Sequence, residues 1–134
     1  MIVNVEQLER ELTAYFAEVL NLVVDTSIFR GQLPETVNNG VACRITGQQA
    51  GNQIDHATFN VQLLGKFASR EDAWVMLARL AEALPKYGEQ TANFVLVYLL
   101  QEGGSNAPFT HTERGKVMQY ASFNLRTAVL TLQA

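Results

Sequence analysis

The stretch "HATFNVQLLGKFASREDAWVMLARLAEALP", His56 to Pro85, decides the fold because it passes from a strand pattern to a helix pattern. Its first part alternates apolar residues, Ala57 to Leu63, with polar ones, which is typical of a strand with one buried side. Its second part, roughly Arg70 to Leu84, has apolar residues at helical spacing and ends at Pro85 and Gly88. The helix face that we expect to be buried consists of Trp74, Leu77, Leu80, Ala81 and Leu84.

The junction of the two patterns, "LLGKFASREDA", contains Gly65, Lys66 and Ser69 and looks like a phosphate-binding turn. A Walker loop needs glycines before its lysine and a Ser or Thr directly after it. Here Gly65 is the single glycine before Lys66, because Val61 to Leu64 precede it, and Ser69 stands three residues beyond the lysine. We therefore interpret Ser69 as a helix N-cap that forms a capping-box-like pair with Asp72. Gly65 and Lys66 are then expected to turn the chain, with Lys66 as a surface charge. The alternative is a small cytoplasmic nucleotide- or ligand-binding domain that uses Lys66.

The first segment predicts an amphipathic helix that ends near Asn21. Asn4 and Gln7 provide a plausible cap at its start. Its apolar face, at three- and four-residue spacing, consists of Val5, Leu8, Leu12, Tyr15, Phe16 and Val19.

The rest of the chain predicts strands separated by polar loops. "SIFRGQLP" and "GVACRIT" are short extended segments bounded by turn residues, and 117–129 is one long strand or two strands broken near Asn124. "ANFVLVYLL" is apolar almost throughout, so we expect it in the middle of the sheet with both faces covered. Segments 47–55 and 101–116 have the composition of loops.

This element order predicts a single α+β domain over residues 1–134. We expect a mixed, mainly antiparallel β-sheet with two amphipathic helices packed on one face. The strands before and after the second helix should form a β-α-β crossover and run parallel, while hairpin-like neighbours should pair antiparallel.

Composition excludes several classes of function. The net charge of -3, without runs of either sign, lacks the basic patch of a nucleic-acid-binding protein, so we expect no direct sequence-specific nucleic acid binding. Cys43 is the only cysteine, which excludes an intrachain disulfide. Charged residues interrupt the N-terminal segment, and no apolar run reaches membrane-spanning length, so we expect no signal peptide and no membrane association.

No set of residues predicts catalysis, a metal site or a cofactor. His56 and His111 are the only histidines and have no ligands at helical spacing, and Cys43 is expected to be a small core residue. The aromatic residues that could line a cleft are expected to lie in the core instead. They are Trp74, Phe94, Tyr98 and Phe123. We therefore expect that the protein is not an enzyme.

Two polar segments remain as candidate partner-contact sites. The first carries Gln48, Gln49 and Asn52. The second carries Phe109, His111, Arg114 and Lys116, a mixture common in protein interfaces. For the second segment, a disordered hairpin tip without function is the alternative.

Two stretches, "IFRGQLPETVNNGVACRITG" and "FNVQLLGKFASREDAWVMLARLAEALP", carry a resemblance to a protein family. With the order of elements over residues 1–100, the chain resembles the tail-terminator and minor-capsid (tail completion) proteins of long-tailed bacteriophages. The matching features are a "G-x-L-P" segment and a strand that feeds a helix with an Ala-Trp pair. The residues are Gly31, Leu33, Pro34, Phe59 to Leu64, Asp72, Ala73 and Trp74.

The resemblance implies a structural phage or prophage protein. Copies would assemble as a ring, expected to be a hexamer, on the end of the tail tube. The ring would end tail polymerisation and mediate head-tail joining. Its partners would be copies of itself, the tail tube protein and the head-tail connector protein. The protein would be found in the virion, in the tail or neck, and in the host cytoplasm during assembly. An assembly adaptor that never enters the virion is a further alternative.

Overall fold

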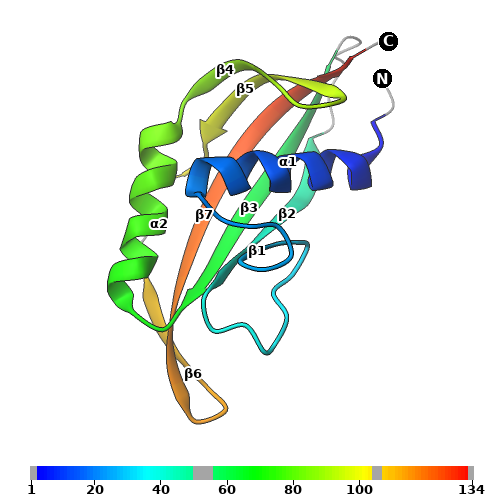
Figure 1. Cartoon of the computed structure of the whole chain (residues 1–134). Helices are drawn as coiled ribbons and strands as arrows, with labels where there is room; N and C mark the ends of the chain where they lie inside the picture. Colours follow the sequence, from blue (N-terminus) through cyan, green and yellow to red (C-terminus); the bar gives the residue numbers. More distant parts are fainter. Residues whose placement is uncertain (1–2, 50–55, 104–106, 133–134) are drawn as a thin grey trace.

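The computed structural model describes residues 3–49, 56–103 and 107–132, which form two helices and seven strands. The helices lie over one face of the sheet (Figure 1). The predicted α+β class, with a mainly antiparallel mixed sheet, is confirmed. The elements are α1 (Val5–Leu20), β1 (Ile28–Arg30), β2 (Gly40–Gln49), β3 (Ala57–Phe67), α2 (Arg70–Ala83), β4 (Lys86–Gln90), β5 (Phe94–Gln101), β6 (Phe109–Glu113) and β7 (Lys116–Thr131).

The strands follow the order β1-β2-β3-β7-β5-β4, and β6 pairs with one end of β7. Strands β3 and β5 both pair antiparallel with β7, which lies between them, so they run parallel to each other as expected for the crossover. Strand β4, which the sequence did not predict, lies between α2 and β5 in the chain. The expectation that hairpin-like neighbours pair antiparallel is wrong for β1 and β2, which are parallel. The segment 31–39 between them carries the chain back to the end where β1 began.

The apolar strand β5 does not lie in the middle of the sheet. It is next to the edge strand β4, and only one of its faces is buried against the helices. Phe94, Leu96 and Leu99 are buried, whereas Val97 is 36% exposed. The prediction failed because helices cover one face of the sheet only, so an apolar residue on the other face stays partly open.

Helix α1 is capped as predicted. The Asn4 side chain accepts a hydrogen bond from the Gln7 amide, and Asn21 ends the helix in the left-handed conformation, with φ of 56°. The Glu9 carboxylate reaches the edge of the sheet, where it accepts a hydrogen bond of 2.9 Å from the backbone N–H of Ile45 in β2. The α1 face that packs on the sheet includes Leu8, Leu12 and Phe16, which are fully buried.

Helix α2 begins at the predicted cap, where the Ser69 hydroxyl accepts a hydrogen bond from the Asp72 amide at 3.1 Å. Its buried face is the predicted one in part: Leu77 and Leu80 are buried as expected, but Trp74 is 45% exposed and Ala81 is exposed. The residues that pack inward are Ala73, Met76, Leu77 and Leu80. A Cβ atom at Gly65 of β3 would lie 2.4 Å from the Met76 sulfur. Glycine at this position therefore lets α2 approach the strand closely with its smaller residues.

Two segments predicted as loops are partly strand. Residues 109–113 of the second segment form β6, which turns at Arg114 and Gly115 into β7, and β7 is one continuous strand through Asn124. Gly47–Gln49 of the first segment belong to β2. Asn52, a predicted contact residue of the first segment, lies outside the described residues. Within the described residues, neither helix is long and apolar enough to cross a membrane.

Candidate interaction site: the hairpin arm

The hairpin of β6 and the start of β7, residues 109–120, is the most prominent projection of the fold; we call it the hairpin arm. β7 pairs with β3 only from Gln119 onward, so Lys116 to Met118 have β6 as their strand partner. The arm consequently extends beyond the sheet (Figure 1, lower end). Four predicted contact residues lie on it: Phe109, His111, Arg114 and Lys116.

The tip of the arm is a two-residue turn. Arg114 and Gly115 have φ of 52° and 78°, the signs required by the type I′ turn that suits hairpins. A left-handed conformation at a residue other than glycine costs about 1–2 kcal/mol. The arginine makes a contact that the usual Asn would not make, because its guanidinium forms an ion pair with Glu35 of the 31–39 segment.

A charged cluster holds the base of the arm. Lys66 Nζ lies 3.2 Å from Glu113 Oε2, and the Tyr120 hydroxyl donates a hydrogen bond to the same oxygen. Lys66 is only 6% exposed and lies within β3, paired with Tyr120 and Gly40. The interpretation of Lys66 as a surface charge in a turn is therefore wrong.

The two faces of β3 explain why Gly65 and Lys66, which resembled a phosphate-binding turn, stand side by side in the sequence. Successive residues of a strand point to opposite faces. Gly65 faces α2, where Met76 packs against it, so Lys66 faces the opposite side and meets Glu113. The ammonium is already paired, which disfavours Lys66 as a nucleotide ligand.

The cluster shifts the pKa values of Glu113 and Tyr120. Hydrogen bonds from Tyr120 and then Lys66 lower the pKa of the Glu113 carboxyl. Burial, together with the hydrogen bond to Glu113, raises the pKa of Tyr120 to about 12. At neutral pH Glu113 is thus a carboxylate and Tyr120 a neutral phenol.

Aromatic side chains line one side of the arm. The Phe109 ring stacks on Tyr120 with a centroid distance of 5.6 Å, and His111 meets the same ring edge-on at 5.8 Å. Phe109 is 51% exposed, and Val117, on the other side of the arm, is 60% exposed. An exposed aromatic residue beside basic ones is a composition that protein interfaces favour.

The structure does not bring the first group of predicted contact residues to the arm. Gln48 and Gln49 pair with Phe59 and Thr58, near the start of β3, whereas the arm begins beside its last residues. At about 3.3 Å per residue, the two regions are roughly 25–30 Å apart. They cannot form one small contact site.

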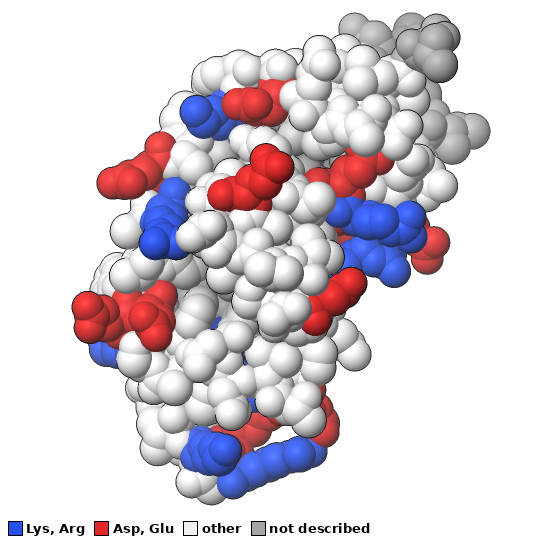
Figure 2. Space-filling view, in the orientation of Figure 1, with Lys and Arg blue, Asp and Glu red and all other residues white. Residues whose placement is uncertain are grey.

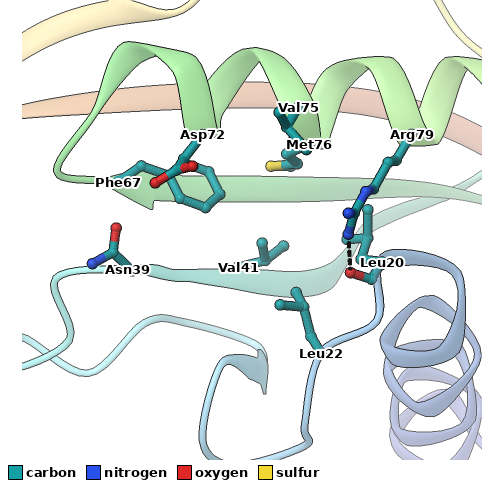
Figure 3. A pocket seen from close by; sticks show the side chains of 9 residues that line it. All are labelled: Leu20, Leu22, Asn39, Val41, Phe67, Asp72, Val75, Met76 and Arg79. Atoms are coloured by element: carbon teal, nitrogen blue, oxygen red, sulfur yellow. Dashed lines mark hydrogen bonds between the residues drawn. The ribbon is translucent and has the colours of Figure 1, made fainter.

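A groove between α2 and the C-terminal end of α1, above β2 and β3, was not predicted from the sequence. It has a volume of about 260 Å³ and is open to solvent. Figure 3 shows its lining of Leu20, Leu22, Asn39, Val41, Phe67, Asp72, Val75, Met76 and Arg79. Arg79 donates a hydrogen bond of 2.9 Å to the Leu20 carbonyl at one end. The signal available in the sequence was Val75, an apolar residue outside the face of α2 that was predicted to be buried, and in the structure it is 41% exposed.

The structure also places the candidates for a nucleophile and for metal ligands. Cys43 is fully buried, as predicted, and burial raises the pKa of its thiol to about 12. Over the described ranges, no group of three or more His, Cys, Asp or Glu side chains could hold a metal ion. Charges of both signs are interspersed on the face in Figure 2.

The fold defined by these elements, a mainly antiparallel sheet with helices on one face, also occurs in a chain of a solved virion structure. The chain matches no family model and no curated protein. It does match a chain of a solved structure described as the virion of a native gene transfer agent (GTA) particle. The TM-score is 0.53 at 16% sequence identity, and the match covers 94% of this chain and 91% of that one. At this identity the similarity concerns the fold.

Proposed function

We propose that the chain is a structural protein of a phage-like virion, without catalytic activity. The observation that carries this proposal is the shared fold with a chain of a gene transfer agent virion, which extends over 94% of the sequence. The projecting arm supports it, because its exposed aromatic and basic residues suit contacts between proteins.

The more specific role that we propose is that of a tail terminator. Copies assemble as a ring on the tail tube, end its polymerisation and join it to the head connector. The resemblance in "IFRGQLPETVNNGVACRITG" and in the strand-to-helix stretch supports this role. The arm at one end of the molecule and Gln48 and Gln49 at the other give it two separate surfaces for different partners.

Negative-stain microscopy of the purified protein, alone and mixed with tail tubes, tests the terminator role. We expect a ring at one end of each tube. Tubes that remain uncapped at saturating protein would contradict the role. Immunodetection in purified particles separates a virion protein from an assembly adaptor, which would be absent from them.

The alternative of a nucleotide-binding domain has a separate test. Any ligand that binds only the native state raises the melting temperature by mass action. We expect no change in melting temperature with saturating nucleotide and Mg²⁺, since Lys66 is buried and paired with Glu113.

A further inference from the structure

The groove between α2 and the end of α1 has an apolar interior and an open mouth. Its floor is formed by Val41 of β2 and Phe67 of β3, and its wall by Val75 and Met76 of α2. Val75 is 41% exposed, so the described chain leaves the mouth of the groove partly open. Exposed apolar surface with polar groups at its rim marks a contact site. Asp72 supplies a carboxylate to the groove lining.

The arm carries complementary groups on one of its sides. Phe109 pairs with Tyr120, and Glu113 pairs with Lys116, so Phe109 and Lys116 point to the same side of the hairpin. Tyr120 in turn pairs with Lys66, which faces away from α2. The exposed Phe109 ring and the Lys116 ammonium therefore lie on the side of the sheet opposite the helices.

This arrangement prevents a chain from filling its own groove. The groove opens on the helix side, and Phe109 points to the other side of the same sheet. A second copy laid against the helix side can present its arm with Phe109 toward the groove.

The charges of the two surfaces also match. Asp72 in the groove and Lys116 on the arm have no ion-pair partner among the described residues. Their opposite charges would attract when the arm of one copy meets the groove of another, which fixes orientation as well as affinity.

Both surfaces lie toward the same end of the molecule. Phe67, the last residue of β3, lines the groove and pairs with Gln119 at the base of the arm. Contact between such surfaces places two copies side by side at the same level instead of end to end. Because the surfaces differ, the contact is heterologous and generates a ring when the rotation closes.

We propose that the groove between α2 and the end of α1 binds the hairpin arm of a second copy of this chain, with Phe109 in the apolar groove and Lys116 beside Asp72. This inference rests on the proposed ring and names its contact.

Cysteine cross-linking between two different variants tests the contact. Val75→Cys and Phe109→Cys are prepared separately, one with a size tag, and mixed on the order of 1 mM, an effective concentration typical of tethered partners. The native Cys43 is fully buried and does not compete. We expect oxidation to give mostly the mixed dimer. The matched control replaces Phe109→Cys by Val97→Cys, a residue that is 36% exposed on β5. Equal cross-linking of the two pairs would overturn the proposal.

A charge exchange provides a second test that does not depend on cysteines. Asp72→Lys and Lys116→Asp should each weaken self-association at least tenfold, measured by sedimentation velocity across protein concentrations. The double variant should recover most of the loss, because it restores the pair with the signs exchanged. Circular dichroism verifies that each variant is folded. Failure of the double variant to recover would contradict the contact.

The contact and the function can fail independently. Rings that cap tail tubes but show no cross-link between positions 75 and 109 would overturn the contact and leave the terminator role standing. Cross-linked oligomers that never cap a tube would support the contact and overturn the terminator role.

Discussion

Lys66 Nζ lies 3.2 Å from Glu113 Oε2, and this pair ties the hairpin arm to the central strand β3. Lys66 is 6% exposed, so loss of its partner would leave an ammonium with little access to water. Breaking one side of such a pair is more destabilising than replacing the charge by an apolar residue of similar size. Glu113→Ala should therefore lower the melting temperature more than Lys66→Met does, as measured by circular dichroism. The double variant should resemble Lys66→Met, and a Glu113→Ala protein as stable as the wild type would contradict this role.

Tyr120 should make stability depend on alkaline pH. Its pKa is raised from 10.0 to about 12, so its contribution is complete below pH 10 and is lost as pH rises through 12. Urea unfolding of the wild type should show a falling free energy of unfolding across this window. Tyr120→Phe should have a shallower fall, with some slope remaining because burial also raises the pKa of Tyr15. Identical pH profiles for the two proteins would contradict the prediction.

Gly65 should not tolerate a side chain. An added Cβ would lie 2.4 Å from the Met76 sulfur and 2.5 Å from the Phe67 ring. Gly65→Ala should therefore reduce the free energy of unfolding by about 1–3 kcal/mol, the usual cost of overpacking. Gly47→Ala in β2 is the matched control, because its Cβ would meet only the Asn60 side chain at 3.7 Å. Equal effects in chemical denaturation would show that close approach of α2 does not select glycine at position 65.

Arg126 on β7 should be dispensable for stability. Its Nε is buried and has no hydrogen-bond partner among the described residues. A buried donor without a partner costs about 1–3 kcal/mol, so Arg126→Met should leave the free energy of unfolding unchanged or raise it. Arg44→Met is the control, since Arg44 Nε donates to Gln62 Oε1 at 2.8 Å. This variant should lose stability, and a larger loss for Arg126→Met would refute the argument.

The features predicted correctly from the sequence are those that depend on neighbouring residues. The caps at Asn4 and Ser69 depend on amides three residues away, and the alternation in β3 needs only a sheet and one covered face. Such local signals retain their meaning in any tertiary context.

The failures have tertiary causes. The run Phe94 to Leu100 is apolar on both faces of the strand. Its sequence therefore does not indicate that helices cover only one of these faces. Trp74 and Val75 gave α2 apolar residues on more than one side, and the close approach of Met76 to Gly65 on β3 depends on residues of another element. Lys66 was misassigned because its partner Glu113 lies far along the chain, on a hairpin that composition alone presented as a loop.

The Glu9 carboxylate has a consequence for how copies of this protein can meet. It occupies the Ile45 N–H at 2.9 Å, a backbone donor that an incoming foreign strand would need. Free strand edges invite open-ended addition of further chains, and natural proteins guard them against aggregation. With this donor occupied and β1 only three residues long, the β1–β2 side is a poor template for fusing one sheet to the next. Neighbouring copies can then contact each other through side chains without pairing strand to strand into a fibre. Glu9→Leu should remove that protection.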